Sequence, residues 1–360
     1  MASNSFGNLF RITTFGESHG SGIGVVIDGC PAGLELTSQD IDLELARRRP
    51  GARAHTSPRN EDDRVDILSG LFEGKTTGAP IALWIKNKDA DSSAYEAVKN
   101  LYRPGHANFT YLEKYGVFDH RGGGRASARE TAARVAAGAV AKKLLAHEGI
   151  EVVGFLCAVG DVVCPDVEMK QLREQTRLSP LFCPDRAIET AMVQVLSVAQ
   201  EAGDSLGGVV GCVATVPVGL GDPVYNKLEA LLAYAMLSIP ASKGFEIGEG
   251  FAAARMQGSQ HNDRFMAEGD GVRLATNHAG GTLGGISTGE PLVFRVAFKP
   301  TSSIRKPQET VTVDGQVATL QMPTTARHDP CVAIRAVPVV EAMAALVLAD
   351  AVLLNRSARI

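Results

Sequence analysis

The sequence predicts an α+β fold in a single compact domain that spans residues 1–360. The chain is 45% hydrophobic and 21% charged, which is ordinary for a globular protein large enough to bury a sizeable core. Strand-like runs and helical patterns are mixed without the regular alternation that marks a doubly wound sheet or a barrel. Length alone favours two domains, but no linker rich in Pro, Gly or Ser marks a boundary.

Four short apolar runs are predicted as strands. They cover residues 24–28, 81–85, 209–216 and 292–297. The 38 glycines, more than a tenth of the chain, gather in clusters. We therefore expect many tight turns and close approaches of the backbone.

Two helices are predicted from their start signals. The first is expected to begin at Ser127, whose hydroxyl would cap it while Glu130 completes a capping box, and to continue over residues 132–147. The second follows Asp329, a good N-cap, and Pro330, a good first helical residue. Pro338 predicts a break before a longer helix over residues 339–353.

Charge and cysteine usage limit the class of protein. The net charge of -4 argues against a protein that binds nucleic acid, because such domains usually carry a clear basic excess. The six cysteines include no C-x-x-C pair, and a chain of this length needs no disulfides. The polar N-terminus lacks the pattern of a signal peptide. We therefore expect reduced thiols and a cytoplasmic location.

The most apolar stretch covers residues 336–354. Glu341 and Asp350 interrupt it, and charges inside a bilayer are costly. This pattern predicts a buried helix in a soluble protein without a membrane span.

Common motifs for nucleotide and metal sites are absent from the sequence. There is no G-x-x-x-x-G-K-[ST], and no G-x-G-x-x-G opens a helix after a strand. The eight histidines show no H-x-x-x-H or H-E-x-x-H spacing. We therefore expect neither a P-loop nor a standard Rossmann enzyme, and no metal ion.

Polar, glycine-rich turns carry the candidate catalytic residues. His19 lies in such a turn at residues 16–20, where an imidazole can transfer protons to a ligand. The alternative is a turn histidine that bonds only to backbone. Arg103 and His106 share a second turn, and the run of glycines at 122–124 leads into a predicted helix start that can bind an anion. The alternative for that run is a glycine hinge used for close packing.

Arginines are concentrated at residues 47–49 and recur at Arg53, Arg59 and Arg64. Guanidinium groups bind phosphate and carboxylate bidentately, so this cluster suits a small anionic ligand. The alternative is a solvated basic loop balanced by the acids at residues 61–63. The hydroxyls and lysine of residues 299–303 would suit a phosphate or a flavin edge, whereas Asp329 has the simpler role of a helix N-cap.

Together these segments resemble the chorismate synthase family. Its three signature regions are matched by residues 16–31, which begin GESHG, by residues 124–139, which begin GRASARET, and by residues 327–343, which begin RHDPC. Between them lie RPG at 49–51, RPGH at 103–106, NHAGG at 277–281 and KPTSS at 299–303, in the family's order. The resemblance covers essentially the whole chain.

The resemblance implies a layered β-α-β sandwich, a homotetramer and a lyase reaction. The family removes phosphate and a proton from 5-enolpyruvylshikimate 3-phosphate by anti-1,4-elimination, giving chorismate as the last common step of the shikimate pathway. The reaction requires reduced FMN with no net redox change. Whether NADPH reduces the flavin on this chain stays open.

The resemblance also implies roles for individual residues. His19 would assist the departing phosphate, His106 would protonate or stabilise the reduced flavin anion, and Asp329 would help flavin N5 remove the substrate proton. The substrate carries two carboxylates and a phosphate of roughly -2 charge. The residues expected to bind it are Arg48, Arg53, Arg103, Arg129, Arg134 and Arg335. The expected flavin contacts are Ser18, Arg125, Ala126, Ser127, Pro240, Ala241, Gly284, Lys299, Pro300, Thr301, Ser302, Ser303 and Arg327.

The sequence departs from the common family pattern at three positions. Asn108 stands where many members have Asp, Ala126 replaces a frequent serine, and Arg53 is shifted by one position. Two other functions remain as alternatives. One is a cofactor-free phosphate lyase or transferase, and the other is an RNA-binding protein that uses the arginine-rich segment, which the net charge and the lack of interleaved aromatics disfavour.

Overall fold

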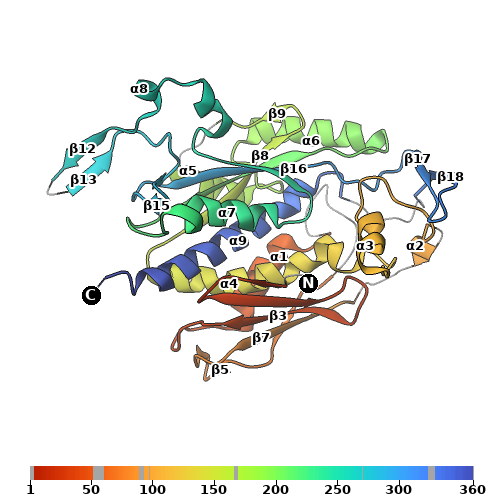
Figure 1. Ribbon diagram of the computed structural model, residues 1–360, viewed down its shortest axis with the longest axis horizontal. Coiled ribbons are helices and arrows are strands. Elements are labelled where there is room, and N and C mark those ends of the chain that lie inside the picture. The colour runs from red at the N-terminus through yellow and green to blue at the C-terminus, as the bar shows by residue number, and fades with distance from the viewer. Residues whose placement is uncertain are drawn as a thin grey trace.

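The computed structural model describes residues 4–51, 61–88, 93–96, 98–165, 169–269, 271–322 and 329–359. Two five-stranded antiparallel sheets enclose a central layer of helices (Figure 1). The first sheet has the strand order β1 (Ser5–Phe6), β2 (Arg11–Gly16), β3 (Gly22–Asp28), β7 (Ile81–Lys86), β4 (Val65–Ile67). The second has the order β11 (Ser242–Ile247), β16 (Leu292–Phe298), β10 (Gly208–Ala214), β8 (Val152–Val159), β9 (Val162–Val163).

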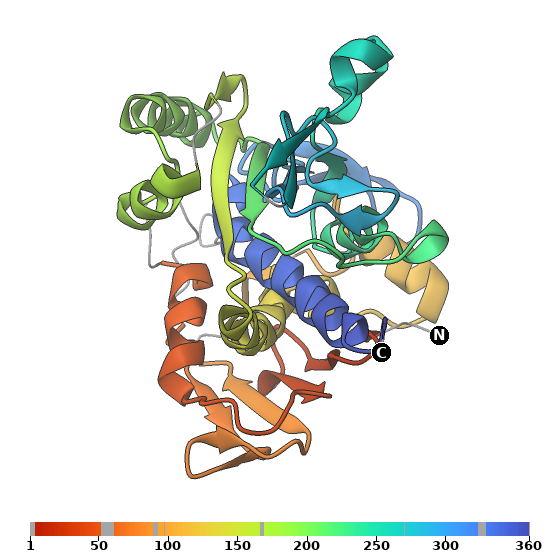
Figure 2. The same ribbon diagram turned by 90° about the vertical axis from the view of Figure 1, so that its left-hand side faces the viewer.

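Nine α-helices lie in the described part of the chain. They are α1 (Ser38–Arg48), α2 (Ser93–Glu96), α3 (Asn108–Tyr115), α4 (Thr131–His147), α5 (Met169–Leu178), α6 (Arg186–Glu201), α7 (Leu228–Leu237), α8 (Gly258–His261) and α9 (Val332–Asn355). Helices α1 and α4 pack on the first sheet, and α9 packs on β8 and β10 of the second. Figure 2 shows the blue α9 between the two sheets, and α5 and α6 pack against β8. The predicted layered β-α-β sandwich is therefore confirmed, whereas the boundaries of one domain at 1–360 stay a prediction.

Four small hairpins and four 3-10 turns complete the described elements. The hairpins are β5 (Leu71–Phe72) with β6 (Lys75–Thr76), β12 (Phe265–Glu268) with β13 (Gly271–Leu274), β14 (Thr282–Leu283) with β15 (Ile286–Ser287), and β17 (Gln308–Val311) with β18 (Val317–Leu320). The 3-10 turns are η1 (Gly124–Ala126), η2 (Ala128–Glu130), η3 (Val224–Asn226) and η4 (Gly250–Arg255).

One hydrophobic core joins both sheets to the central helices. Small residues let α4 and α9 approach closely, since a Cβ on Gly138 would lie only 2.4 Å from the Cβ of Ala342. The four predicted strands are confirmed as β3, β7, β10 and β16, because their apolar runs supply the faces that pack on this core.

The predicted helix starts are partly wrong. Ser127 accepts a hydrogen bond from the Arg129 N–H and caps η2, after which α4 begins at Thr131. No capping box forms, because the Glu130 carboxylate accepts from Arg134 Nε at 2.9 Å instead. An ion pair one turn along the helix has replaced the expected bond to the backbone.

Helix α9 also differs from its prediction. Cys331, not Asp329, is its N-cap, and Pro338 lies inside one continuous helix. A proline inside a helix costs roughly 3 kcal/mol, and burial on nearly all sides of α9 offsets that cost. The helix is long and apolar enough to cross a membrane by composition, but 89% of that stretch is buried inside the protein, as the sequence predicted for a core helix.

Candidate active site

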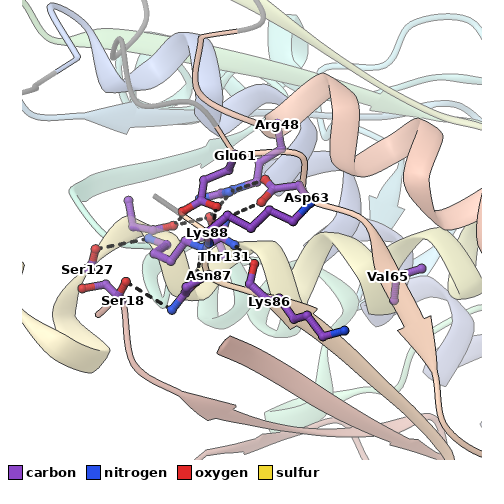
Figure 3. A network of polar contacts seen from close by, with 12 residues as sticks. Ser18, Arg48, Glu61, Asp63, Val65, Lys86, Asn87, Lys88, Ser127 and Thr131 are labelled. Carbon is purple, nitrogen blue, oxygen red and sulfur yellow. Dashed lines mark hydrogen bonds and ion pairs between the residues drawn. The ribbon is translucent and has the colours of Figure 1, made fainter. Parts of the chain in front are cut away.

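A buried ion cluster lies where α1 ends against the start of α4 (Figure 3). Arg48 Nη1 lies 3.1 Å from Asp63 Oδ2, Nε lies 3.1 Å from Thr131 Oγ1, and Nη2 lies 2.9 Å from the Ala128 carbonyl oxygen. Arg129 Nη1 pairs with the other oxygen of Asp63. The alternative of a solvated basic loop is therefore wrong for Arg48 and Asp63, which are 1% and 2% exposed.

The same cluster includes the start of α9. Arg335 donates from Nη1 to Asp329 Oδ2 at 2.7 Å and from Nε to the Arg48 carbonyl oxygen at 3.3 Å. Three guanidinium groups thus meet two carboxylates, Asp63 and Asp329. A third carboxylate, Glu61, is 1% exposed and lies in the same polar network (Figure 3). Guanidinium groups gathered in this way suit an anionic ligand such as a phosphate or a carboxylate.

The pKa values within the cluster follow from burial and from the neighbouring charges. Burial, followed by the Arg335 charge, lowers the pKa of Arg48 to about 9, which still leaves it protonated at neutral pH. Burial alone would raise the pKa of Asp63, but the charges of Arg48 and Arg129 lower it below its usual value. Asp63 also has φ of +46°, a conformation in which few residues other than glycine are found. Strained backbone of this kind gathers at functional sites.

The turn between β2 and β3 places His19 beside the glycine run 122–124. Ser18 Oγ lies 2.9 Å from His19 Nδ1, and the imidazole meets the Tyr95 ring edge-on at 5.5 Å between centroids. A Cβ on Gly122 would lie 2.1 Å from His19 Cε1. The glycine therefore provides the space in which the imidazole lies.

A second turn brings Arg103 and His106 to the same region. Arg103 Nη2 lies 2.7 Å from His106 Nε2, and its guanidinium carbon lies 5.5 Å from the centre of the Tyr95 ring. A guanidinium group has no acceptor, so the contacted imidazole nitrogen must accept. A Cβ on Gly123 would lie 3.1 Å from His106 Cε1. Tyr95 thus contacts both candidate catalytic turns.

Lys299 connects this turn to the 299–303 segment. Its Nζ donates to the Gly105 carbonyl oxygen at 2.9 Å, and its backbone N–H donates to Ala241 at 3.0 Å. A Cβ on Gly105 would lie 3.1 Å from the Cβ of Ser302. Pro240 and Ala241 therefore lie beside Lys299, as the flavin prediction requires. Burial, followed by the Lys243 charge, lowers the pKa of Lys299.

Two predicted arginines bind groups of the protein, and one predicted glycine lies apart from the cluster. Arg125 donates to the β2 residue Thr14, to Asn4 and to the carbonyl oxygen of Gly16. Arg134 binds Glu130 and donates from Nη1 to Ser238 Oγ at 2.7 Å, near the end of α7. Gly284 lies in the turn between β14 and β15, and Figure 1 places β15 at the left and α3 at the right. Arg53 and Arg327 lie outside the described residues.

The contacts of Asn108 explain why asparagine stands at this position, where many members of the family have aspartate. Its Oδ1 accepts from the Arg103 N–H at 3.1 Å, and its Nδ2 donates to the Leu101 carbonyl oxygen at 2.8 Å. An aspartate could make the first bond but not the second. The asparagine therefore closes the turn that carries Arg103 and His106.

Sequence reasoning missed three residues of this site: Asn87, Tyr95 and Thr131. The only signal for Asn87 was a polar residue two positions after a predicted strand. Thr131 lay inside the matched segment 124–139 but was given no role, and Tyr95 gave no signal at all. All six cysteines are buried and none forms a disulfide bond. Among the described residues no three His, Cys, Asp or Glu side chains form a group that could hold a metal ion.

Comparison with known proteins agrees with this arrangement. The chorismate synthase family profile matches residues 10–353. The chorismate synthase of Protochlamydia amoebophila (strain UWE25) is 61% identical over 99% of both chains. That of Synechococcus elongatus (strain ATCC 33912 / PCC 7942 / FACHB-805) is 56% identical over 96% of both chains. A chorismate synthase crystal structure superposes with a TM-score of 0.77 at 36% identity, covering 97% of this chain and 92% of the other. The chain belongs to the chorismate synthase family.

Proposed function

We propose that this chain converts 5-enolpyruvylshikimate 3-phosphate to chorismate at the cluster around Arg48. Family membership makes the chain a carbon–oxygen lyase that acts on a phosphate ester. The single observation that carries the location is the cluster of three guanidinium groups, with Arg48 and Arg129 buried and Arg335 partly buried, where the end of α1 meets the starts of α4 and α9.

The charge of the substrate suits this set of arginines. Two carboxylates and a phosphate of roughly -2 charge give the ligand about four negative charges. Arg103, which is 7% exposed, adds a further guanidinium from the neighbouring turn. Bidentate binding by guanidinium fixes orientation as well as charge, which a stereospecific elimination needs.

A flavin would fit the side of the site formed by residues 299–303. Thr301 Oγ1 is buried without a hydrogen-bond partner in the described part of the chain, and a buried hydroxyl of this kind calls for a ligand. The glycines at 122–124, all with positive φ, leave room beside His19 and His106. Residues that would hold the cofactor are Ser127, Ala241, Lys299, Thr301 and Ser302. When bound and reduced, FMN supplies electron density to a reaction that lacks an adjacent carbonyl to hold negative charge.

Three groups would then take part in the acid and base steps. His19, held by Ser18, would give a proton to the departing phosphate, and His106 would stabilise negative charge next to Arg103. Asp329, bonded to Arg335 at 2.7 Å, would help to remove the proton that leaves carbon. Each of these groups is placed by an arginine or a serine that also belongs to the cluster or its turns.

Four further properties of the family extend this proposal. NADPH is a candidate reductant for the flavin on the enzyme, and the functional unit would be a homotetramer. We propose a cytoplasmic location, which suits six cysteines that form no disulfide bond. Nucleic acid and membrane are not expected as partners.

Anaerobic turnover tests the function directly. The purified protein is mixed with 5-enolpyruvylshikimate 3-phosphate, FMN and a chemical reductant, and chorismate and phosphate are measured together. We expect one phosphate per chorismate over many turnovers, with no net loss of reduced FMN. A parallel reaction with oxidised FMN and no reductant serves as the control and should give no product.

Two results would contradict the proposal. Phosphate release without FMN would support the cofactor-free lyase. One flavin oxidised per chorismate would mean a net transfer of electrons in each turnover, which the assignment excludes.

A further inference from the structure

The side chain of Asn87 joins the His19 turn to the arginine cluster (Figure 3). Asn87 follows β7 directly. Its Nδ2 lies 2.8 Å from the carbonyl oxygen of Gly20, 3.0 Å from that of Glu17 and 3.2 Å from that of Ser18. Its Oδ1 accepts from Arg129 Nε at 2.9 Å. One amide thus contacts three backbone positions of the turn and one guanidinium.

The orientation of this amide follows from its partners. Arginine can only donate, so it must face the oxygen, and the three carbonyls can only accept, so they must face the nitrogen. A flipped amide would set Oδ1 against three carbonyl oxygens and Nδ2 against a cation. Only asparagine or glutamine can satisfy both sides, and the direct contacts to Gly20 and Arg129 require the shorter of the two.

Both ends of the connection belong to the proposed site. Arg129 also pairs with Asp63, which holds Arg48. The turn presents His19 over Gly122, where a Cβ would lie 2.1 Å from the imidazole. Asn87 therefore sits between the group expected to protonate the phosphate and a group expected to bind the substrate.

We propose that Asn87 is a positioning residue that sets the place of His19 relative to Arg129. The expected effect on kcat rests on the proposed function, whereas the expected effect on the position of His19 does not. A displacement of about 1 Å at a catalytic group can cost as much as about 100-fold in rate. Loss of the Asn87 amide should therefore lower kcat although Asn87 does not touch the reacting atoms.

Two substitutions separate the two sides of the amide. Asn87→Asp keeps an acceptor for Arg129 but turns a carboxylate toward the three carbonyls of the turn. Asn87→Ala removes both the acceptor for Arg129 and the donor to the turn. Ser69→Ala is the matched control, since Ser69 Oγ bonds Pro80 and Ala82 at the other end of β7. That serine stabilises a turn of the same sheet without contact to the site.

Two measurements test the proposal on the intact protein. The first is the side-chain NMR signal of His19, assigned with His19→Gln and recorded without substrate or flavin. The chemical shift of this signal should change in both Asn87 variants and should be unchanged in Ser69→Ala. The second is steady-state turnover with reduced FMN, in which both Asn87 variants should lose at least about tenfold in kcat. KM should rise in both variants, because Asn87→Ala removes a partner of Arg129 and Asn87→Asp sets a negative charge beside an arginine expected to bind the anionic substrate.

The outcomes distinguish this proposal from the function itself. An unmoved His19 signal in Asn87→Asp, or a kcat within twofold of wild type, overturns the role of Asn87. Wild-type protein without any turnover overturns the proposed function, while the NMR comparison still decides whether Asn87 places His19. If Asn87→Ala does not fold, the NMR signal of His19 and kcat are both measured on Asn87→Asp, which has nearly the same size as asparagine.

Discussion

Arg48 and Asp63 form an ion pair of 3.1 Å in which both side chains are almost completely buried. Asp63 also holds Arg129, so one acid places two of the arginines expected to bind substrate. A buried pair of this kind is weak evidence for stability, because desolvation offsets much of the attraction. The ion pair is better explained by its effect on the site, because Asp63 holds two guanidinium groups in the positions in which they would bind an anion.

Arg48→Lys should raise the KM for the substrate more than it changes the affinity for FMN. Lysine keeps the charge but cannot reach Thr131, Asp63 and Ala128 together, as the guanidinium does. A lost hydrogen bond to a charged group is worth roughly 1.5–3 kcal/mol, or about 10- to 100-fold in binding. Steady-state kinetics and flavin titration measure the two effects. Arg177→Lys on the exposed end of α5 is the control, and an unchanged KM in Arg48→Lys would place the anion site elsewhere.

His19→Ala and His106→Ala should each keep the fold and lower kcat by about 10²- to 10⁴-fold, the range for a lost general acid or base. Both imidazoles lie in turns beside glycines 122 and 123, not in the core. His147→Ala at the exposed end of α4 controls for the substitution itself. Wild-type kcat in both site variants, measured alongside circular dichroism, would show that these histidines are structural.

The sequence predicted the apolar elements well because their signal is local. Strands β3, β7, β10 and β16 and the burial of α9 follow from runs of apolar residues that pack on one core. The polar contacts were harder to predict. Glu130 pairs with Arg134 and not with the backbone at Ser127, and Asp329 pairs with Arg335 although Asp is a good N-cap. In both cases an ion pair competed with a capping bond, and sequence alone does not decide between them.

The site itself was predicted in part, through motifs that resemblance brought together. His19, Arg48, His106 and Arg129 lie on turns and helix ends that meet only in the folded chain. Asn87 contacts a guanidinium 42 positions away and a turn 67 to 70 positions away. No pattern of spacing connects such segments, so the residues that hold the site together were missed, while the residues expected to act were named only through the resemblance.

Glu341 predicts how stability depends on pH. It lies in the core on α9, where Lys142 Nζ donates at 2.5 Å, Arg47 Nη2 at 2.8 Å and the Gly154 N–H at 2.8 Å. Burial alone would raise the pKa of Glu341, but the Arg47 and Lys142 charges lower it to about 2. A carboxylate with a lowered pKa stabilises the fold above its unfolded pKa of roughly 4.3. That contribution falls as the pH drops through this value toward about 2.

The test compares wild type with Glu341→Gln by urea unfolding between pH 7 and pH 3. We expect wild type to be more stable by about 3 kcal/mol near neutral pH, the free energy that corresponds to lowering the pKa of Glu341 from roughly 4.3 to about 2. The difference in the free energy of unfolding between the two proteins should become smaller below about pH 4.5. In that range the carboxylate of Glu341 takes up a proton when wild type unfolds, whereas glutamine has no group that titrates. A difference that stays constant over this range would mean that packing, not charge, explains the role of Glu341.

Alanine substitutions at Gly122 and Gly116 test whether the reaction depends on the space that Gly122 leaves for His19. Both have φ near +70°, so alanine at either position brings the same left-handed strain of roughly 1–2 kcal/mol. They differ in what a Cβ would meet: nothing within 4 Å at Gly116, but His19 Cε1 at 2.1 Å at Gly122. Gly116→Ala should therefore lower the melting temperature and leave kcat unchanged. Gly122→Ala should lower the melting temperature by a similar amount and reduce kcat by about 100-fold, because the imidazole must move out of place. Equal kcat in the two variants, each folded by circular dichroism, would show that the position of His19 over Gly122 does not matter for the reaction.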